Sequence, residues 1–167
     1  FFASNQHSYA PDRLAVLLKQ ERIKTAGVYD AYMSFALAQS VRGEKKFPLA
    51  AQYLEQAKAG GVSKGLLLGE QAALEFARGD LKAADELYAQ AEKEIGASSE
   101  LLLNRAVIAK QTEDFVKFGS FYEKARLEFP EKTQALWDAG DEKAGFVQPL
   151  ALPVRFSDIM VLFEVPP

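Results

Sequence analysis

Residues 65–98 read GLLLGEQAALEFARGDLKAADELYAQAEKEIGAS, and this stretch decides the fold of the chain. Its apolar residues recur with helical spacing on both sides of the turn Arg78-Gly79-Asp80, which predicts two amphipathic helices joined by a short connection. The same pattern recurs 34 residues earlier and 34 residues later, with no insertion between the units. The sequence therefore predicts three consecutive helical hairpins, at about 31–64, 65–98 and 99–132.

Small residues return at three positions of the unit, and a larger apolar residue returns at a fourth. Small side chains let two helices cross closely, and the larger one fills the space between neighbouring hairpins. The middle unit has Ala72, Ala84, Tyr88 and Ala91 at these positions. The first unit has Ala38, Ala50, Leu54 and Ala57, and the third has Ala106, Phe118, Tyr122 and Ala125.

This spacing and these residues resemble the tetratricopeptide repeat (TPR), a family of helix-turn-helix units of the same length. The resemblance covers all three units, and ARGDLKAADELYAQAEK in the middle unit is the best match. In the third unit Glu113 replaces the turn glycine, and in the first unit the glycine has moved to Gly43. The chain also departs from the family at the positions that often hold Trp and Tyr, which here are Ser34, Leu68 and Leu102, and Val41, Glu75 and Ala109.

The resemblance implies an all-α fold, a right-handed α-solenoid of helix-turn-helix hairpins with an end-cap helix on each side. The alternative is an unrelated bundle of helices whose periodicity arose by chance. The expected cap helices are about 11–24, which opens at Pro11, and about 133–143 after Pro130. A break at 24–27 with Asp30 as the next N-cap is expected before the first unit. The expected hairpin helices are about 31–43 and 48–59, 65–78 and 82–95, and 99–112 and 115–129.

The chain therefore divides into a solenoid, residues 1–145, and a proline-rich apolar tail, residues 146–167. Pro149 and Pro153 exclude a continuous helix through the first half of the tail. Apolar residues alternate with others over residues 150–157, which is the period of an extended chain. Exposure of such a segment to water is unfavourable, so we expect it to pack on the inside of the array. The alternatives are that it pairs with another chain or leads into a further segment.

Composition excludes several classes of function. The net charge of −3 does not indicate a nucleic-acid partner, and the absence of cysteine excludes disulfides and thiolate metal sites. No apolar run is long enough to span a membrane. No set of residues has the spacing of a nucleophile, an acid–base pair or a metal site, so we expect no enzyme, no catalytic or metal-binding residue and no cofactor. The start at Phe1 suggests an upstream segment removed by processing, which leaves cytoplasmic and periplasmic or secreted locations open.

A partner-binding groove is expected on the concave face, where the resemblance places the first helix of each hairpin. Apolar and polar side chains mix there, and Gly69 and Ala73 leave room for a peptide backbone. The alternative is that the ends of this chain pack on these residues. The predicted binding residues are Tyr32, Phe35, Gln39, Arg42, Leu66, Glu70, Ala73, Phe76, Leu103, Asn104, Val107 and Lys110.

The leading functional hypothesis is a protein-interaction scaffold or adaptor that binds an extended apolar peptide or partner segment in this groove. Some TPR domains bind the carboxylate of a chaperone tail, but Glu70 and Glu100 at the equivalent positions would repel one. A second hypothesis is an assembly module that forms a homo-oligomer through residues 146–167. A third is a sensing module of a larger membrane or envelope protein, to which the tail leads.

Overall fold

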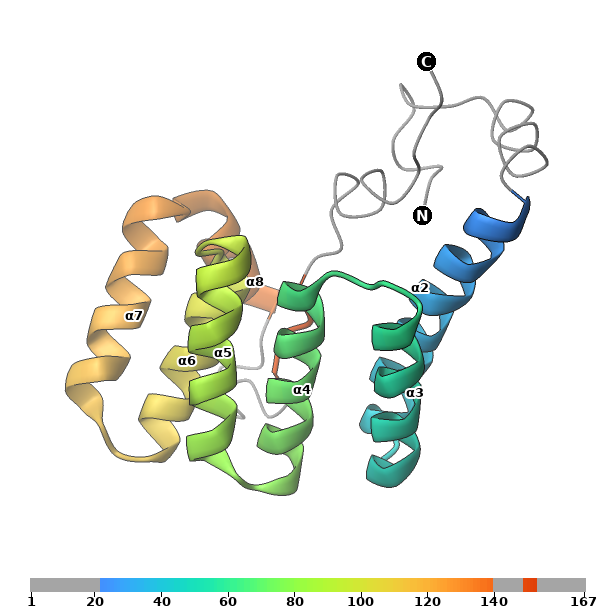
Figure 1. Cartoon of the computed structure of the whole chain (residues 1–167). Helices are drawn as coiled ribbons and strands as arrows, with labels where there is room; N and C mark the ends of the chain where they lie inside the picture. The colour runs from blue at the N-terminus through green and yellow to red at the C-terminus, as the bar shows by residue number, and fades with distance from the viewer. Residues whose placement is uncertain (1–21, 140–148, 153–167) are drawn as a thin grey trace, which may run out of the picture.

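The computed structural model describes residues 22–139 and 149–152, and within these ranges it holds seven α-helices and no β-strand (Figure 1). The described part of the chain is therefore all-α, as predicted. Consecutive helices pack as hairpins α2/α3, α4/α5 and α6/α7, and α8 packs on the last of them. The helices are α2 (Arg22–Gly43), α3 (Phe47–Ala59), α4 (Lys64–Arg78), α5 (Leu81–Ile95), α6 (Ser99–Gln111), α7 (Phe115–Glu128) and α8 (Pro130–Ala139).

Three side-chain N-caps start helices where the sequence predicts them. Asp80 accepts a hydrogen bond from the Ala83 amide at 3.0 Å, at the start of α5. Ser98 accepts one from the Leu101 amide at 3.2 Å, and Asp114 accepts one from the Lys117 amide at 3.1 Å. Each cap satisfies a backbone N–H that has no partner inside its helix, which explains the sharp boundaries of α5, α6 and α7.

The turns inside the three hairpins share one backbone conformation although their sequences differ. Gly79 has a φ of 93°, and the residues at the equivalent positions, Lys45 and Glu113, have φ values of 62° and 61°. A left-handed residue therefore stands at the same point of every unit. Gly43, to which the glycine of the first unit has moved, belongs to the last turn of α2 instead.

Replacing Glu113 by glycine should raise the free energy of unfolding by about 0.5–1 kcal/mol. Glycine removes the steric cost of a left-handed backbone, which exceeds the entropy that it adds to the unfolded chain. Urea denaturation followed by circular dichroism measures the change. Thr112→Gly is the control, because Thr112 has a φ of −90° and glycine there should destabilise the chain. A loss of stability in both variants would contradict this explanation of the turn.

Two of the predicted boundaries are wrong. Helix α2 begins at Arg22, with no break at 24–27, and Asp30 lies inside it. The stretch contains no proline, and one glycine costs a helix only about 1 kcal/mol, which a helix of 22 residues tolerates. Helix α8 begins at Pro130 rather than near 133, because proline fits the first helical position. The rest of the predicted N-terminal cap helix and residues 140–143 lie outside the described residues.

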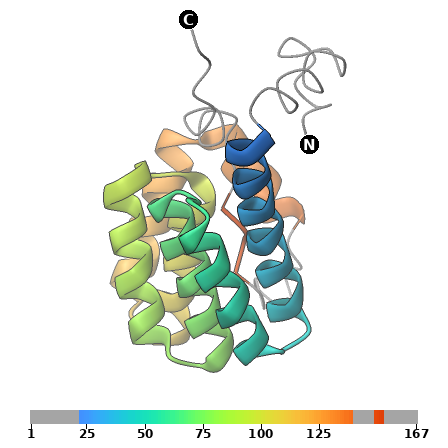
Figure 2. The ribbon, with the colours of Figure 1, turned by 45° about the vertical axis from the view of Figure 1, so that its right-hand side comes forward.

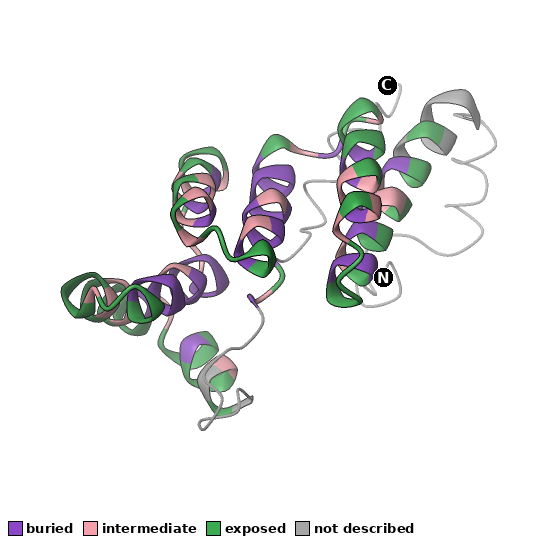
Figure 3. Ribbon diagram, turned by 90° about the horizontal axis from the view of Figure 1, so that it is seen from below, coloured by how far each residue is buried: buried purple, intermediate pink, exposed green. Residues whose placement is uncertain are grey.

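The recurring alanines are all buried between packed helices. Tyr88 and Leu54 fill the spaces between neighbouring hairpins and are also buried. In the third unit Phe118 and Tyr122 are only half-buried and stack with their ring centroids 6.1 Å apart. Figure 3 shows the buried residues concentrated where the helices face one another. The alanines are Ala38, Ala50, Ala57, Ala72, Ala84, Ala91, Ala106 and Ala125, each at most 1% exposed.

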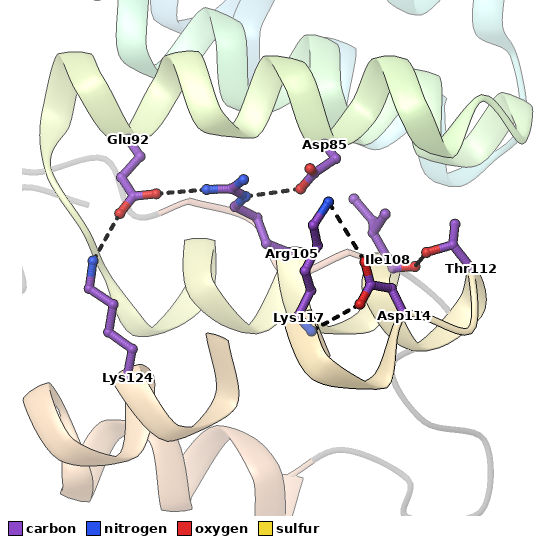
Figure 4. Close-up of polar contacts among 8 residues, drawn as sticks. All are labelled: Asp85, Glu92, Arg105, Ile108, Thr112, Asp114, Lys117 and Lys124. Carbon is purple, nitrogen blue, oxygen red and sulfur yellow. Dashed lines mark hydrogen bonds and ion pairs between the residues drawn. The ribbon is translucent and has the colours of Figure 1, made fainter. Parts of the chain in front are cut away.

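A charged cluster ties α6 to both of its neighbours (Figure 4). The Arg105 guanidinium donates to Asp85 at 2.9 Å and to Glu92 at 3.0 Å, both on α5. Its central carbon lies 4.3 Å from the ring centroid of Phe121 on α7, and Lys124 of α7 reaches Glu92 at 3.3 Å. These partly buried contacts fix the position of α6, the helix that carries Asn104.

Candidate functional site

Residues 149–152 lie against α4 and α6, and against a cluster that includes residues of α2 (Figure 2). We call the surface that these helices present to the segment the inner face. It contains the positions from which the sequence predicts a groove. The segment is far away in sequence, because Leu150 follows Asn104, its hydrogen-bonding partner, by 46 residues.

Asn104 holds the backbone of the segment through a pair of hydrogen bonds. Its Nδ2 donates to the carbonyl oxygen of Leu150 at 2.7 Å, and the Leu150 N–H donates to Asn104 Oδ1 at 2.7 Å. The Asn104 side chain is only 2% exposed, so each of these polar groups would lack a water partner if the pair were broken. An amide that pairs with both N–H and C=O of one residue recognises an extended backbone without regard to its side chain.

The side chains of the segment differ in environment, and Pro149 at its start is buried. Leu150 packs against the cluster of Leu102, Leu103 and Ala125, whereas Ala151 is exposed. Leu152 is 7% exposed and packs against Gly69 of α4. A methyl group at Gly69 would overlap the Cδ1 atom of Leu152, so the absence of a side chain there creates the space for this leucine. Two leucines spaced two residues apart thus point inward, as in an extended chain.

A buried ion pair links α2 and α4 on this face. The Arg42 Nε atom lies 2.5 Å from Glu70 Oε1, and the two side chains are 7% and 4% exposed. Burial raises the pKa of Glu70, and the nearby Arg42 and a hydrogen bond from Gln39 offset part of that increase. Arg42 of this chain therefore supplies the positive charge that balances Glu70.

Most of the predicted binding residues are buried, so the inner face is not an open apolar surface. Phe35 and Leu66 belong to the same cluster as Leu152, whereas Phe76 and Val107 pack with α5. Tyr32 and Gln39 are half-buried, and Lys110 is exposed. The predicted residues that are buried are Phe35, Arg42, Leu66, Glu70, Ala73, Phe76, Leu103, Asn104 and Val107.

The structure adds Pro149, Leu150 and Leu152 to the candidate site. These three were not among the binding residues predicted from the sequence. The alternation over residues 150–157 signalled an extended segment, but it did not indicate which helices the segment contacts. Like Glu70, Glu100 stands at a position equivalent to those that bind a carboxylate in some TPR domains. It pairs with Lys132 at 3.2 Å. Both acids therefore have partners within the chain.

Neither a metal centre nor a membrane-spanning helix occurs in the part of the chain that the structure describes. Within residues 22–139 and 149–152, no three His, Asp or Glu side chains gather as metal ligands. None of the helices in those ranges is both long and apolar enough to cross a bilayer. The inner face presents the Asn104 amide, the internal Arg42–Glu70 ion pair and apolar side chains, aromatic as well as aliphatic.

Comparison with known proteins found no matching family model, no matching curated protein and no matching solved structure. The function is therefore inferred from the inner face itself.

Proposed function

We propose that this chain is a protein-interaction scaffold of the TPR type, a right-handed α-solenoid that binds an extended peptide on its inner face. The observation that carries the proposal is the paired hydrogen bonding of Asn104 to Leu150, with Leu152 against Gly69. These contacts use features that an extended apolar peptide of any partner also has. Such peptides bind through main-chain hydrogen bonds and through pockets for alternate side chains.

The charge of the face favours an uncharged ligand segment. Glu70 is neutralised by Arg42, and Glu100 pairs with Lys132, so neither carboxylate requires a cation from the partner. A charged side chain buried beside Gly69 would have no partner there, which is costly. The proposed ligand is therefore a neutral, apolar stretch rather than an acidic or a basic tail.

The scaffold itself supports binding without rearrangement of its helices. The alanines hold consecutive hairpins close together, and the Arg105 cluster fixes α6 relative to α5 and α7. Asn104 and Gly69 are thus presented by packed helices rather than by loops. Rigid presentation of the binding groups lowers the entropic cost of binding a flexible peptide.

The test uses peptides selected from a random 12-residue phage library. The library is screened against the full chain and against its Leu152→Asp variant. Gly69→Leu should weaken their binding at least tenfold, because the new side chain fills the space that Leu152 occupies. Gly119→Leu is the matched control, since no atom lies within 4 Å of the position of a Cβ at this glycine of α7. Fluorescence anisotropy measures the affinities. Equal affinity of the peptides for Gly69→Leu and for Gly119→Leu, or failure to select any peptide, would refute the proposal.

A further inference from the structure

We infer that Pro149–Leu152 is a built-in competitor for the inner face, and that the partner peptide has the same Leu-x-Leu pattern. The inference rests on the proposed function and names its ligand class and its regulation. In the bound partner, Asn104 would pair with the backbone of the first leucine. The second leucine would pack against Gly69.

Two anchor points hold the segment, namely the amide of Asn104 and the space beside Gly69. Competition follows because each anchor point can bind only one segment at a time. The amide of Asn104 already donates to one atom of Leu150 and accepts from another. The space beside Gly69 is filled, since a single methyl group there would overlap Leu152. A partner that uses either anchor must displace the segment.

Displacement leaves the helical scaffold intact. The helix caps at Asp80, Ser98 and Asp114 and the ion pair between Arg42 and Glu70 involve no atom of the segment. Displacement breaks the two hydrogen bonds to Asn104 and exposes the buried Pro149 and the two packed leucines. Since the segment belongs to the same chain as the face that it covers, its binding is intramolecular, and a partner in solution must overcome that advantage. Only a partner that matches the anchors well would displace it.

The burial of each segment residue defines what the partner must carry. Pro149 is buried, so the position before the first leucine favours an apolar residue. Ala151 is exposed, so the intervening residue is free to vary. Leu150 is half-buried among aliphatic side chains, where another apolar residue would fit. Leu152 is buried in a space bounded by a glycine, which favours an aliphatic side chain of its size and excludes a charged one.

A fluorescein-labelled peptide of residues 147–154, VQPLALPV, tests the inference by anisotropy with the full-length chain. Its affinity for Leu152→Asp should exceed its affinity for the wild type at least tenfold, because the internal segment no longer competes. Ala151→Asp is the matched control and should bind the peptide as weakly as the wild type does, since residue 151 is exposed. A peptide with aspartate in place of its second leucine should bind none of these chains.

The outcomes separate the inference from the proposed function. Equal affinity of the peptide for the wild type and for Leu152→Asp would overturn the inference, as would no binding to Leu152→Asp. The proposed function would survive either result if the library peptides still lose affinity in Gly69→Leu.

If Leu152→Asp does not fold, hydrogen exchange in the wild type decides. Excess peptide must then accelerate exchange of the Leu150 amide, and unchanged exchange would overturn the inference.

Discussion

Replacing Arg42 by methionine should lower the free energy of unfolding by about 3–5 kcal/mol, because it leaves the buried carboxylate of Glu70 without its partner. Urea denaturation at pH 7, followed by circular dichroism, measures this loss. The double variant Arg42→Met with Glu70→Met is the control. Its loss should be much smaller, since apolar residues of similar volume often replace a buried ion pair at little cost. Equal losses in the two variants would show that packing of Arg42, and not its charge, stabilises α2 against α4.

The loss of stability in Arg42→Met should depend on pH. The pKa of Glu70 is raised above its ordinary value of 4.5, so the folded state binds a proton more tightly than the unfolded state does. The contribution of Glu70 to stability is therefore greatest when it is protonated, and it is lost as the pH rises through the raised pKa. Without Arg42 this pKa rises further. The stability gap between wild type and Arg42→Met should thus narrow as the pH falls from 7 toward 4.5, and a constant gap would contradict this.

Replacing Asn104 by alanine should detach residues 149–152 from the inner face. The change leaves the N–H and C=O of Leu150 without their partners, at a cost of about 2–4 kcal/mol for two partly buried groups. Hydrogen exchange of the Leu150 amide should accelerate roughly 30- to 700-fold, since every 1.4 kcal/mol is about a factor of ten. The helices themselves should keep their circular dichroism signal.

Gln90→Ala is the matched control for Asn104→Ala. Gln90 is an exposed amide on α5, so its loss should leave exchange at Leu150 unchanged. If Asn104→Ala also leaves that exchange unchanged, the paired hydrogen bonds do not hold the segment.

Local features of the sequence predicted the hairpins well. The alanines that recur every 34 residues are buried, and Asp80, Ser98 and Asp114 cap the helices that they precede. These features depend on residues a few positions apart, which a sequence shows directly. The start of α2 was wrong because Gly27 indicated a break, whereas no second helix breaker accompanies it. The first residue of α8 was wrong because a proline that ends one helix can also open the next.

The sequence predicted that the tail packs on the inside of the array, but the individual contacts of the inner face depend on distant residues and could not be predicted. Phe35 and Phe76 were predicted as groove residues, with packing by the ends of the chain as the alternative, and they are buried in two different clusters. The sequence placed Arg42 and Glu70 on the same face, but their pairing depends on how closely α2 and α4 pack. Asn104 was predicted as a binding residue, yet nothing local indicated that its partner is Leu150, 46 residues away.

The side-chain amide of Asn104 gives the most direct test of the claim that the inner face binds an extended peptide. Its two Nδ2 protons appear in the ¹⁵N–¹H spectrum of the labelled Leu152→Asp chain, in which the segment should be released. Titration with the unlabelled peptide VQPLALPV should shift these signals toward their wild-type positions, with the same midpoint as the anisotropy. Saturable binding of the peptide with no change in the Asn104 signals would contradict the account.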